Sequence, residues 1–296
     1  MARRGIGIRA LALFERTARV LRRLGLGSLV DRVGPALGGR AARLEVEVDG
    51  LTLTGNHVGQ LYYLRELADA GREGLFKDLL VDAVPAGGFA VDGGAHIGYL
   101  TLQLARAAGP DGNVLAFEPN PETRPVLERN LRRNGLAGRV TVCPQALGAA
   151  PGEAELPLSG GGDTSALAPV PSARATVRVE VTSLDVQLAA GPVPDVVKLD
   201  LEGSEVAALT GMEALLARAT DAPRLFVECN AGALAAAGTS PAELLGVLES
   251  HGFGVWRIDE RERLLRPAVL ADLGGDYANL VCARGAAVHA YEALSA

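Results

Sequence analysis

A glycine-rich turn after a short apolar run is the first segment able to do chemistry, and it reads Val91-Asp92-Gly93-Gly94-Ala95-His96-Ile97-Gly98. Glycines at a strand-to-helix turn let the backbone approach a ligand closely, and the following helix start offers backbone N–H groups. The segment resembles a dinucleotide fingerprint with Ala95 at the middle glycine, so NAD is one ligand it could hold. Asp92 disfavours NAD, because a carboxylate at the strand tip repels a diphosphate but suits the ammonium of a methionine moiety.

A second carboxylate, Glu118, follows about twenty residues after Gly98, in the sequence Phe117-Glu118-Pro119-Asn120. An ionised Glu has two acceptor oxygens and no donor, so it can accept both hydroxyls of a ribose. This position indicates a nucleoside without distinguishing NAD from S-adenosylmethionine. The structural alternative is a solvated Glu at a helix start.

Three charged residues, Lys198, Asp200 and Glu202, alternate at the end of a third apolar run. A period of two puts them on one side of a strand, where burial is costly unless the charges pair or bind something. We therefore expect a functional site. The alternative is an ion pair of Lys198 with Asp200 or Glu202 that only orders the sheet.

These groups need a scaffold that brings strand ends together. Apolar runs predict strands at 89–92, 113–118, 140–143, 176–181, 195–201, 224–229, 254–258 and 279–283, and helical patterns lie at 97–108, 121–134, 204–218 and 240–251. Such alternation predicts an α/β fold, a Rossmann-like, mostly parallel sheet with helices on both faces, over residues 81–296. Right-handed crossovers then place the carboxyl ends of the parallel strands, and the site, at one edge.

Residues 1–80 are predicted to form an accessory region of helix, hairpin and helix. Residues 8–24 have the pattern of a basic amphipathic helix, which could contact an anionic membrane surface, although packing on the main domain as a lid is favoured. Two alternating runs flank Asp49-Gly50, which is a strong hairpin signal.

The composition narrows the class of protein. The chain has 296 residues, is 48% hydrophobic and carries a net charge of −6, which favours one main core and argues against a nucleic-acid binder. Arginines interrupt the N-terminal apolar stretch, so a cytoplasmic protein is expected. Three widely spaced cysteines lack metal-binding spacing and are expected to be buried thiols: Cys143, Cys229 and Cys282.

In their order and spacing, the motifs of residues 88–284 resemble the FkbM-type methyltransferase family. The motifs are the turn at 91–98, Ala-Phe-Glu-Pro-Asn-Pro at 116–121, Val-Val-Lys-Leu-Asp-Leu-Glu-Gly-Ser-Glu at 196–205, Phe-Val-Glu-Cys at 226–229 and Tyr-Ala-Asn-Leu at 277–280. The resemblance implies a class I methyltransferase fold, S-adenosylmethionine as cofactor, and methylation of a hydroxyl oxygen on a polyketide, sugar or related secondary metabolite. Residues 1–80 lie outside it.

The resemblance also implies roles for single residues. The turn would cradle the methionine end of the cofactor, Glu118 would hold the ribose, and residues 145–147 would border the adenine. The expected cofactor-binding set is Asp92, Gly93, Gly94, His96, Gly98, Glu118, Pro119, Asn120, Gln145, Ala146, Leu147 and Asp200. His96 stands where the family more often has Asn, so its side chain is expected to be a spectator.

Methyl transfer from a sulfonium is a direct displacement, which requires alignment and, for an alcohol acceptor, a base. The expected bases are Asp200 and Glu202, then Glu228, with His57 a weaker candidate. A divalent cation is not expected, but it could replace the base with oxygen ligands from Asp200, Glu228 and Asn230.

Other readings stay open. An NAD(P)-dependent oxidoreductase could use the same glycine turn, and a non-catalytic membrane-associated protein could use the basic helix. Residues 160–165 could close over the cofactor or form a surface turn, and Tyr277 and Asn279 could line the pocket or only pack in the sheet. The acceptor and the oligomeric state are not encoded in any motif.

Overall fold

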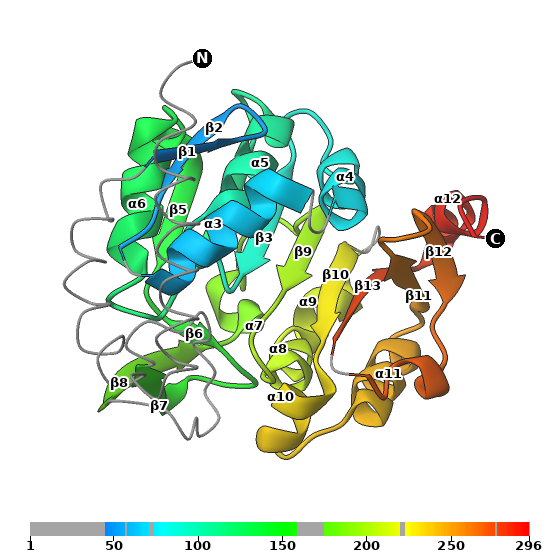
Figure 1. Ribbon diagram of the computed structural model, residues 1–296. Coiled ribbons are helices and arrows are strands. Elements are labelled where there is room, and N and C mark those ends of the chain that lie inside the picture. Colours follow the sequence, from blue (N-terminus) through cyan, green and yellow to red (C-terminus); the bar gives the residue numbers. More distant parts are fainter. Residues whose placement is uncertain are drawn as a thin grey trace, which may run out of the picture.

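A computed structural model describes residues 45–56, 58–70, 74–158, 175–219, 223–275 and 277–295 (Figure 1). The predicted helix at 8–24, His57 and residues 160–165 lie outside the described residues. Within the described chain, the central sheet has eight strands. Their spatial order is β12 (Leu264–Pro267), β11 (Gly254–Asp259), β13 (Ala278–Ala283), β10 (Arg224–Cys229), β9 (Val196–Leu199), β3 (Phe89–Gly93), β4 (Asn113–Phe117) and β5 (Val140–Cys143).

The sheet is mostly parallel, as predicted. Strands β5, β4, β3, β9 and β10 pair in parallel, whereas β13 runs antiparallel to both β10 and β11. The central strands are continuous apolar runs because both faces of the sheet are covered. Adjacent residues Ala90 and Val91 of β3 accordingly belong to two different hydrophobic clusters.

Helices cover both faces of the sheet (Figure 1). On the face of Ala90 lie α3 (Val58–Ala70), α4 (Gly74–Asp82), α5 (Tyr99–Ala108), α6 (Arg124–Arg133) and α12 (Val288–Glu292). On the face of Val91 lie α7 (Leu184–Gln187), α8 (Glu205–Thr210), α9 (Glu213–Arg218), α10 (Ala231–Ala236) and α11 (Pro241–Ser250). Short 3-10 turns occupy Ala137–Arg139, Leu270–Asp272 and Gly285–Ala287. None of the described helices combines the length and the hydropathy that a membrane crossing requires.

Two predicted helices differ from those observed. The helix expected from residue 121 begins at Arg124, with Pro125 in its first turn, where a missing N–H costs nothing. The helix expected over 204–218 is two helices, α8 and α9, because the chain makes a close approach at Gly211. A Cβ there would lie 2.1 Å from the carbonyl oxygen of Gly148.

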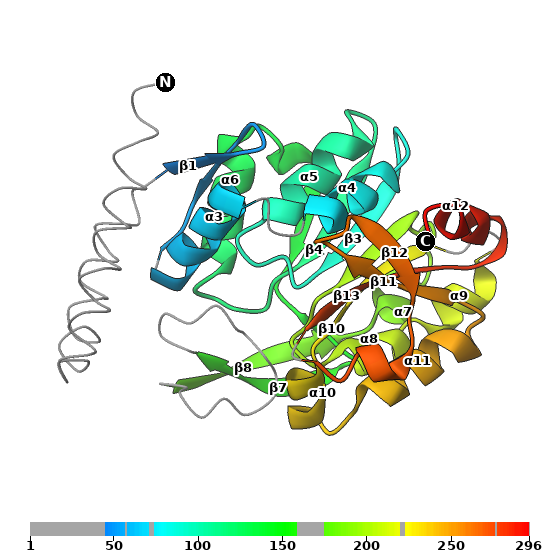
Figure 2. The same ribbon diagram turned by 45° about the vertical axis from the view of Figure 1, so that its right-hand side comes forward.

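The alternating run at 176–181 is a strand, β8 (Ala175–Thr182), but it belongs to a separate sheet of the described chain, with order β6-β8-β7. Its partners β6 (Ala146–Leu147) and β7 (Gly152–Leu158) were not predicted. Figure 2 shows β7 and β8 away from α12, at the other end of the molecule. Thr176, Arg178 and Glu180 of β8 are exposed while the residues between them are not, and Glu153 and Glu155 of β7 are exposed on either side of Ala154, which indicates that one face of this sheet is the more open one.

The predicted hairpin is present as β1 (Glu45–Val48) and β2 (Leu51–Thr54). Asp49 and Gly50 have φ values of 49° and 74°, as a two-residue turn with positive φ at both positions requires. The inner residues of the hairpin belong to the same hydrophobic cluster as α5 and α6. The described part of the accessory region thus packs on the main domain, and the boundary at residue 80 stays a prediction.

Two asparagines hold the hairpin in place, Asn130 of α6 and Asn134 directly after its last residue. Asn134 Oδ1 accepts from Thr52 N at 2.9 Å and Asn134 Nδ2 donates to Thr52 O at 2.8 Å. Asn130 makes the same pair of bonds with Thr54, at 3.0 and 3.1 Å, and also donates to Ile97 O at 2.8 Å. Spaced by four, both amides lie on one helix face and complete the open edge of β2.

Candidate active site

A cavity of about 320 Å³ opens at the carboxyl ends of β3, β4, β9 and β10. Its volume lies at the lower end of the roughly 300–1,000 Å³ typical of ligand pockets. The predicted site residues that line it are Gly94, His96, Glu118, Pro119, Ala146, Leu147, Asp200, Glu202 and Glu228. Predicted residues that lie outside its lining are Asp92, Gly93, Gly98, Asn120 and Gln145.

The position of Asp92 corrects the expectation that its carboxylate points into the ligand space. Asp92 is fully buried beneath the pocket, where Thr101 Oγ1 donates to its Oδ2 at 2.6 Å. Its Oδ1 lies 3.1 Å from Lys198 Nζ. Asp92 therefore reaches a ligand only through the residues it orders.

Lys198 lies at the centre of these contacts. It is 2% exposed, and its Nζ donates to Gly93 O at 3.1 Å and to Gly94 O at 2.8 Å. Asp200 Oδ2 lies 3.6 Å from the same nitrogen. Burial alone would lower the pKa of Lys198, but the charges of Asp92 and Asp200 outweigh it and raise that pKa. Lys198 stays charged and joins the glycine turn to the tip of β9.

Two glycines of the turn are required for close packing. Gly94 has φ 77°, and a Cβ there would lie 1.9 Å from Asp200 O, so the turn touches the end of β9 directly. Gly98 has φ 93°, and a Cβ there would lie 2.5 Å from Leu127 Cδ1. Gly94 thus shapes the pocket, whereas Gly98 lets α5 approach α6.

Glu118 is buried at the tip of β4 and lines the pocket. Its Oε2 accepts from His96 N at 2.7 Å and its Oε1 from Asn120 N at 2.9 Å. Burial raises the pKa of Glu118 to about 7, against the lowering effect of these two bonds. The carboxylate is held in place by backbone donors, and the pocket is its open side.

Two other predicted residues are His96, which lies in the glycine turn, and Gln145, which lies outside the pocket. His96 has φ 50°, and its ring packs edge-to-face on Tyr63 of α3 at 5.2 Å between centroids. Gln145 lies outside the pocket and donates to Glu180 Oε2 at 3.3 Å. The part of the 145–147 segment that borders the pocket is Ala146 and Leu147.

Asp200 and Glu228 lie at the tips of β9 and β10 and both line the pocket, where their charges interact. Asp200 has 41% of its side chain exposed, whereas Glu228 is 8% exposed. Burial, followed by the charges of Asp200 and Glu202, raises the pKa of Glu228 far above its usual range. The raised pKa favours the protonated form of Glu228 at neutral pH.

The period-two expectation for the β9 residues is only partly met. The strand ends at Leu199, and Glu202 lies in the following loop with φ 53°. Lys198, Asp200 and Glu202 nevertheless all line the same pocket.

Sequence reasoning assigned no role to Glu205. Its carboxylate is buried and accepts from Leu201 N at 2.7 Å and from Gly203 N at 3.0 Å, so it shapes the loop that carries Glu202. Burial raises its pKa to about 7. The signal was a carboxylate in the first turn of a predicted helix, where backbone N–H groups need acceptors.

Tyr63 and Tyr99, which also line the pocket, were not predicted either, because neither lies in a recognisable motif. Of the two alternatives expected for Tyr277, lining the pocket or only packing in the sheet, the structure shows the first. Its hydroxyl accepts from Asn279 Nδ2 at 2.9 Å. Asn279 is the cross-strand partner of Glu228.

The residues present fit S-adenosylmethionine. Glu118 offers acceptor oxygens to a ribose, Phe117 and Leu147 offer apolar surface to an adenine, and the backbone of the glycine turn lines the pocket at Gly94. Asn230, the third predicted metal ligand, lines the pocket with Asp200 and Glu228. Within the described ranges, no three His, Cys, Asp or Glu side chains are grouped to hold a metal ion.

Comparisons with known proteins identify the family of this chain. The model of the FkbM methyltransferase domain matches residues 92–255, which is more than half of the chain. A catechol O-methyltransferase from Mycobacterium tuberculosis is 38% identical over 79 residues, which are 27% of this chain and 36% of that protein. The match thus spans about a third of that relative's length.

Solved structures of low sequence identity were also found. The FkbM methyltransferase from Methylobacillus flagellatus is 18% identical, with a TM-score of 0.43, 92% of this chain covered and 70% of that one. A SAM-dependent O-methyltransferase from Thermotoga maritima is 18% identical, with a TM-score of 0.42, 73% of this chain covered and 66% of that one. From its matched segment, which covers more than half of its length, this chain belongs to the FkbM methyltransferase domain family.

Proposed function

We propose that this protein methylates a hydroxyl oxygen of a small molecule, with Asp200 as the general base. The observation that carries the proposal is the Asp200–Glu228 pair, which lies in the pocket beside the glycine turn. Asp200 is the more exposed member, and the raised pKa of Glu228 favours its protonated form, so Asp200 is the carboxylate to which we assign the base.

The reaction needs little covalent chemistry from the protein. S-adenosylmethionine, when bound, supplies a methyl group on a sulfonium, and its carbon–sulfur bond breaks as the carbon–oxygen bond forms. Asp200 takes the proton of the acceptor hydroxyl, and such general-base help is worth about 10²–10⁴-fold. Lys198 holds Asp200 beside the glycine turn, so base and cofactor are aligned before the acceptor arrives.

The charge of the pocket favours an acceptor without an anionic group. Among the described residues that line the pocket, Lys198 is the one lysine or arginine, and its charge is already engaged by Asp92. Glu202 and the Asp200–Glu228 pair leave negative charge beside the reactive position. Hydroxyl acceptors are further supported by the catechol O-methyltransferase of M. tuberculosis, the partial relative described above.

Two measurements test the proposal. In calorimetry, S-adenosylmethionine and S-adenosylhomocysteine should bind in the micromolar range, and no heat at millimolar ligand would contradict the cofactor assignment. Methyl groups labelled with tritium should then pass from S-adenosylmethionine to oxygen within a panel of neutral diols and sugars that begins with catechol. Transfer only to nitrogen in a matched amine panel would contradict the hydroxyl assignment.

The same samples separate the alternatives. Quenching of NADH fluorescence on addition of protein would favour the oxidoreductase, and loss of methyl transfer on treatment with EDTA, restored by Mg²⁺, would favour a cation held by Asp200, Glu228 and Asn230. Asp200→Asn should reduce transfer by about 10²-fold or more, whereas Glu249→Gln, at an exposed carboxylate of α11, should leave it unchanged.

A further inference from the structure

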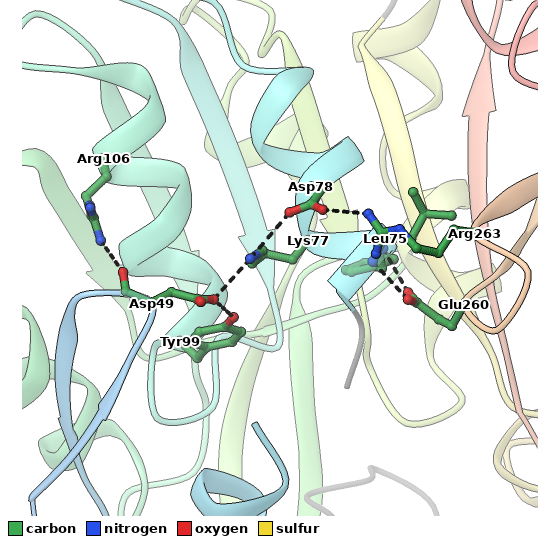
Figure 3. A network of polar contacts seen from close by, with 9 residues as sticks. Asp49, Leu75, Lys77, Asp78, Tyr99, Arg106, Glu260 and Arg263 are labelled. Carbon is green, nitrogen blue, oxygen red and sulfur yellow. Dashed lines mark hydrogen bonds and ion pairs between the residues drawn. The ribbon is translucent and has the colours of Figure 1, made fainter. Parts of the chain in front are cut away.

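The tip of the β1–β2 hairpin is hydrogen-bonded to α5, the helix that follows the glycine turn (Figure 3). Asp49 Oδ2 accepts from the Tyr99 hydroxyl at 2.6 Å, and the Asp49 carbonyl accepts from Arg106 Nη1 at 2.8 Å. Tyr99 and Arg106 are seven residues apart, so they lie on the same face of α5 about two turns apart. The turn of the hairpin therefore lies along that face and contacts it at two points.

The first contact reaches the pocket. Tyr99 is the first residue of α5, follows Gly98 directly, and is one of the residues that line the cavity. The adjoining turn supplies His96 N to Glu118 and the Gly94 carbonyl to Lys198. A shift of the first turn of α5 would therefore move the backbone against which the ligand packs.

The hairpin tip is held from its other side by charge. Lys77 of α4 donates to Asp49 Oδ2 at 3.0 Å and lies 3.3 Å from Asp78 Oδ1. Asp78 in turn accepts from Arg263, in the turn between β11 and β12, at 2.9 Å. The Tyr99 hydrogen bond, opposed by partial burial and aided by Lys77, holds the pKa of Asp49 below its usual value, so the carboxylate is ionised at neutral pH.

The start of α4 is fixed in the same region. Glu260 accepts from Leu75 N and Phe76 N, both at 2.8 Å, which satisfies two backbone donors of the first helical turn (Figure 3). Lys77 is therefore presented to Asp49 from an anchored helix.

We propose that Asp49 is a positioning residue for the cofactor site, acting through Tyr99 on the first turn of α5. Asp49 lies outside the segment matched by the family model, residues 92–255, so part of the affinity for the cofactor comes from the N-terminal hairpin. The inference rests on the proposed use of S-adenosylmethionine.

The test is calorimetric binding of S-adenosylhomocysteine to full-length variants, with the melting temperature of each measured in parallel. Tyr99→Phe removes only the hydroxyl, and Asp49→Ala removes its acceptor. Because a hydrogen bond to a charged group is lost in both, each should raise Kd about fivefold or more, and the double variant should match either single variant. Asp49→Asn keeps an acceptor oxygen and should recover most of the affinity.

Asp78→Asn is the matched control. Asp78 contacts the same Lys77, and its side chain is 47% exposed against 43% for Asp49, but it makes no contact with Tyr99. Its Kd should stay within twofold of the wild type. A Kd within twofold for Tyr99→Phe and Asp49→Ala, even with a lowered melting temperature, would overturn the inference, as would additive effects in the double variant. Failure of the wild type itself to bind would instead overturn the proposed function.

Discussion

Two pairs of strand tips carry carboxylates in this protein, and the surroundings of the two pairs differ. Asp92 and Glu118, on β3 and β4, are buried and held by donors: Lys198 and Thr101 for the first, two backbone N–H groups for the second. Asp200 and Glu228, at the tips of β9 and β10, interact through their charges, and 41% of the Asp200 side chain is exposed.

This difference indicates two roles: Asp92 and Glu118 hold the cofactor site in place, whereas Asp200 and Glu228 take part in the reaction. A carboxylate whose oxygens are fixed by donors is preorganised to bind, whereas carboxyl groups whose charges interact have their proton affinities pushed apart. We therefore expect substitutions at the tips of β3 and β4 to lower stability or cofactor affinity, and substitutions at the tips of β9 and β10 to lower turnover.

Lys198→Met should have the largest effect, because it leaves Asp92 charged and unpaired in the core. Removal of one partner of a buried pair costs about 3–5 kcal/mol of unfolding free energy. Urea unfolding measures it, and the double variant Lys198→Met, Asp92→Asn should regain most of the loss. A single-variant cost below about 1 kcal/mol would mean that Asp92 is not held as the geometry indicates.

Asp200→Asn should reduce turnover by about 10²-fold or more while the Kd for S-adenosylhomocysteine stays within about threefold. The amide keeps the shape of the side chain but cannot take a proton. Steady-state methyl transfer and calorimetry on the same preparation separate the two effects. A loss of affinity as large as the loss of turnover would instead show that Asp200 binds the cofactor, which would contradict the division of roles between the two pairs.

Cofactor affinity should fall at acidic pH because of Glu118. Its pKa is raised to about 7, and ribose hydroxyls donate to the ionised form, so binding below pH 7 must release a proton. Kd should be flat above pH 8 and rise by up to about tenfold per unit below pH 7. Calorimetry in two buffers of different ionisation enthalpy measures the proton.

Glu118→Gln should remove this pH dependence and weaken binding at pH 8. Glu205, whose pKa is also about 7, faces backbone donors of its own loop, so Glu205→Gln should retain the dependence. Persistence of the dependence in Glu118→Gln would show that another group titrates.

His96→Asn should have the smallest effect. Asn tolerates the positive φ of this position, and the bond from His96 to Glu118 comes from the backbone N–H. Losing the ring contact with Tyr63 should cost no more than about 1 kcal/mol of stability, with Kd for S-adenosylhomocysteine within about threefold. A large loss of turnover with unchanged affinity would make the imidazole a catalytic group.

Much of the fold and the location of the site followed from sequence, because apolar runs ending in glycine or a carboxylate mark the strand tips of a parallel sheet. The Asp49-Gly50 turn was equally predictable. The small sheet was not, because β6 has only two residues and β7 includes Pro157, which weakens a strand signal.

Within the site, residue types were predictable but their partners were not. Period two suggested Asp200 and Glu202 as the partners of Lys198, whereas its strongest side-chain partner is Asp92, which is its neighbour only through the register of β3 with β9. The Tyr63–His96 contact depends on how α3 packs beside the glycine turn, and the Asp49–Tyr99 bond on how the hairpin packs on α5. Local sequence patterns carry no record of such tertiary contacts.

A crystal structure with S-adenosylhomocysteine tests the account most directly. Both ribose hydroxyls should donate to Glu118, and the sulfur should face the Asp200 carboxylate with no group between them except water or acceptor. A ribose bound away from Glu118, or a sulfur turned away from Asp200, would contradict the division of the strand tips into a holding pair and a reacting pair.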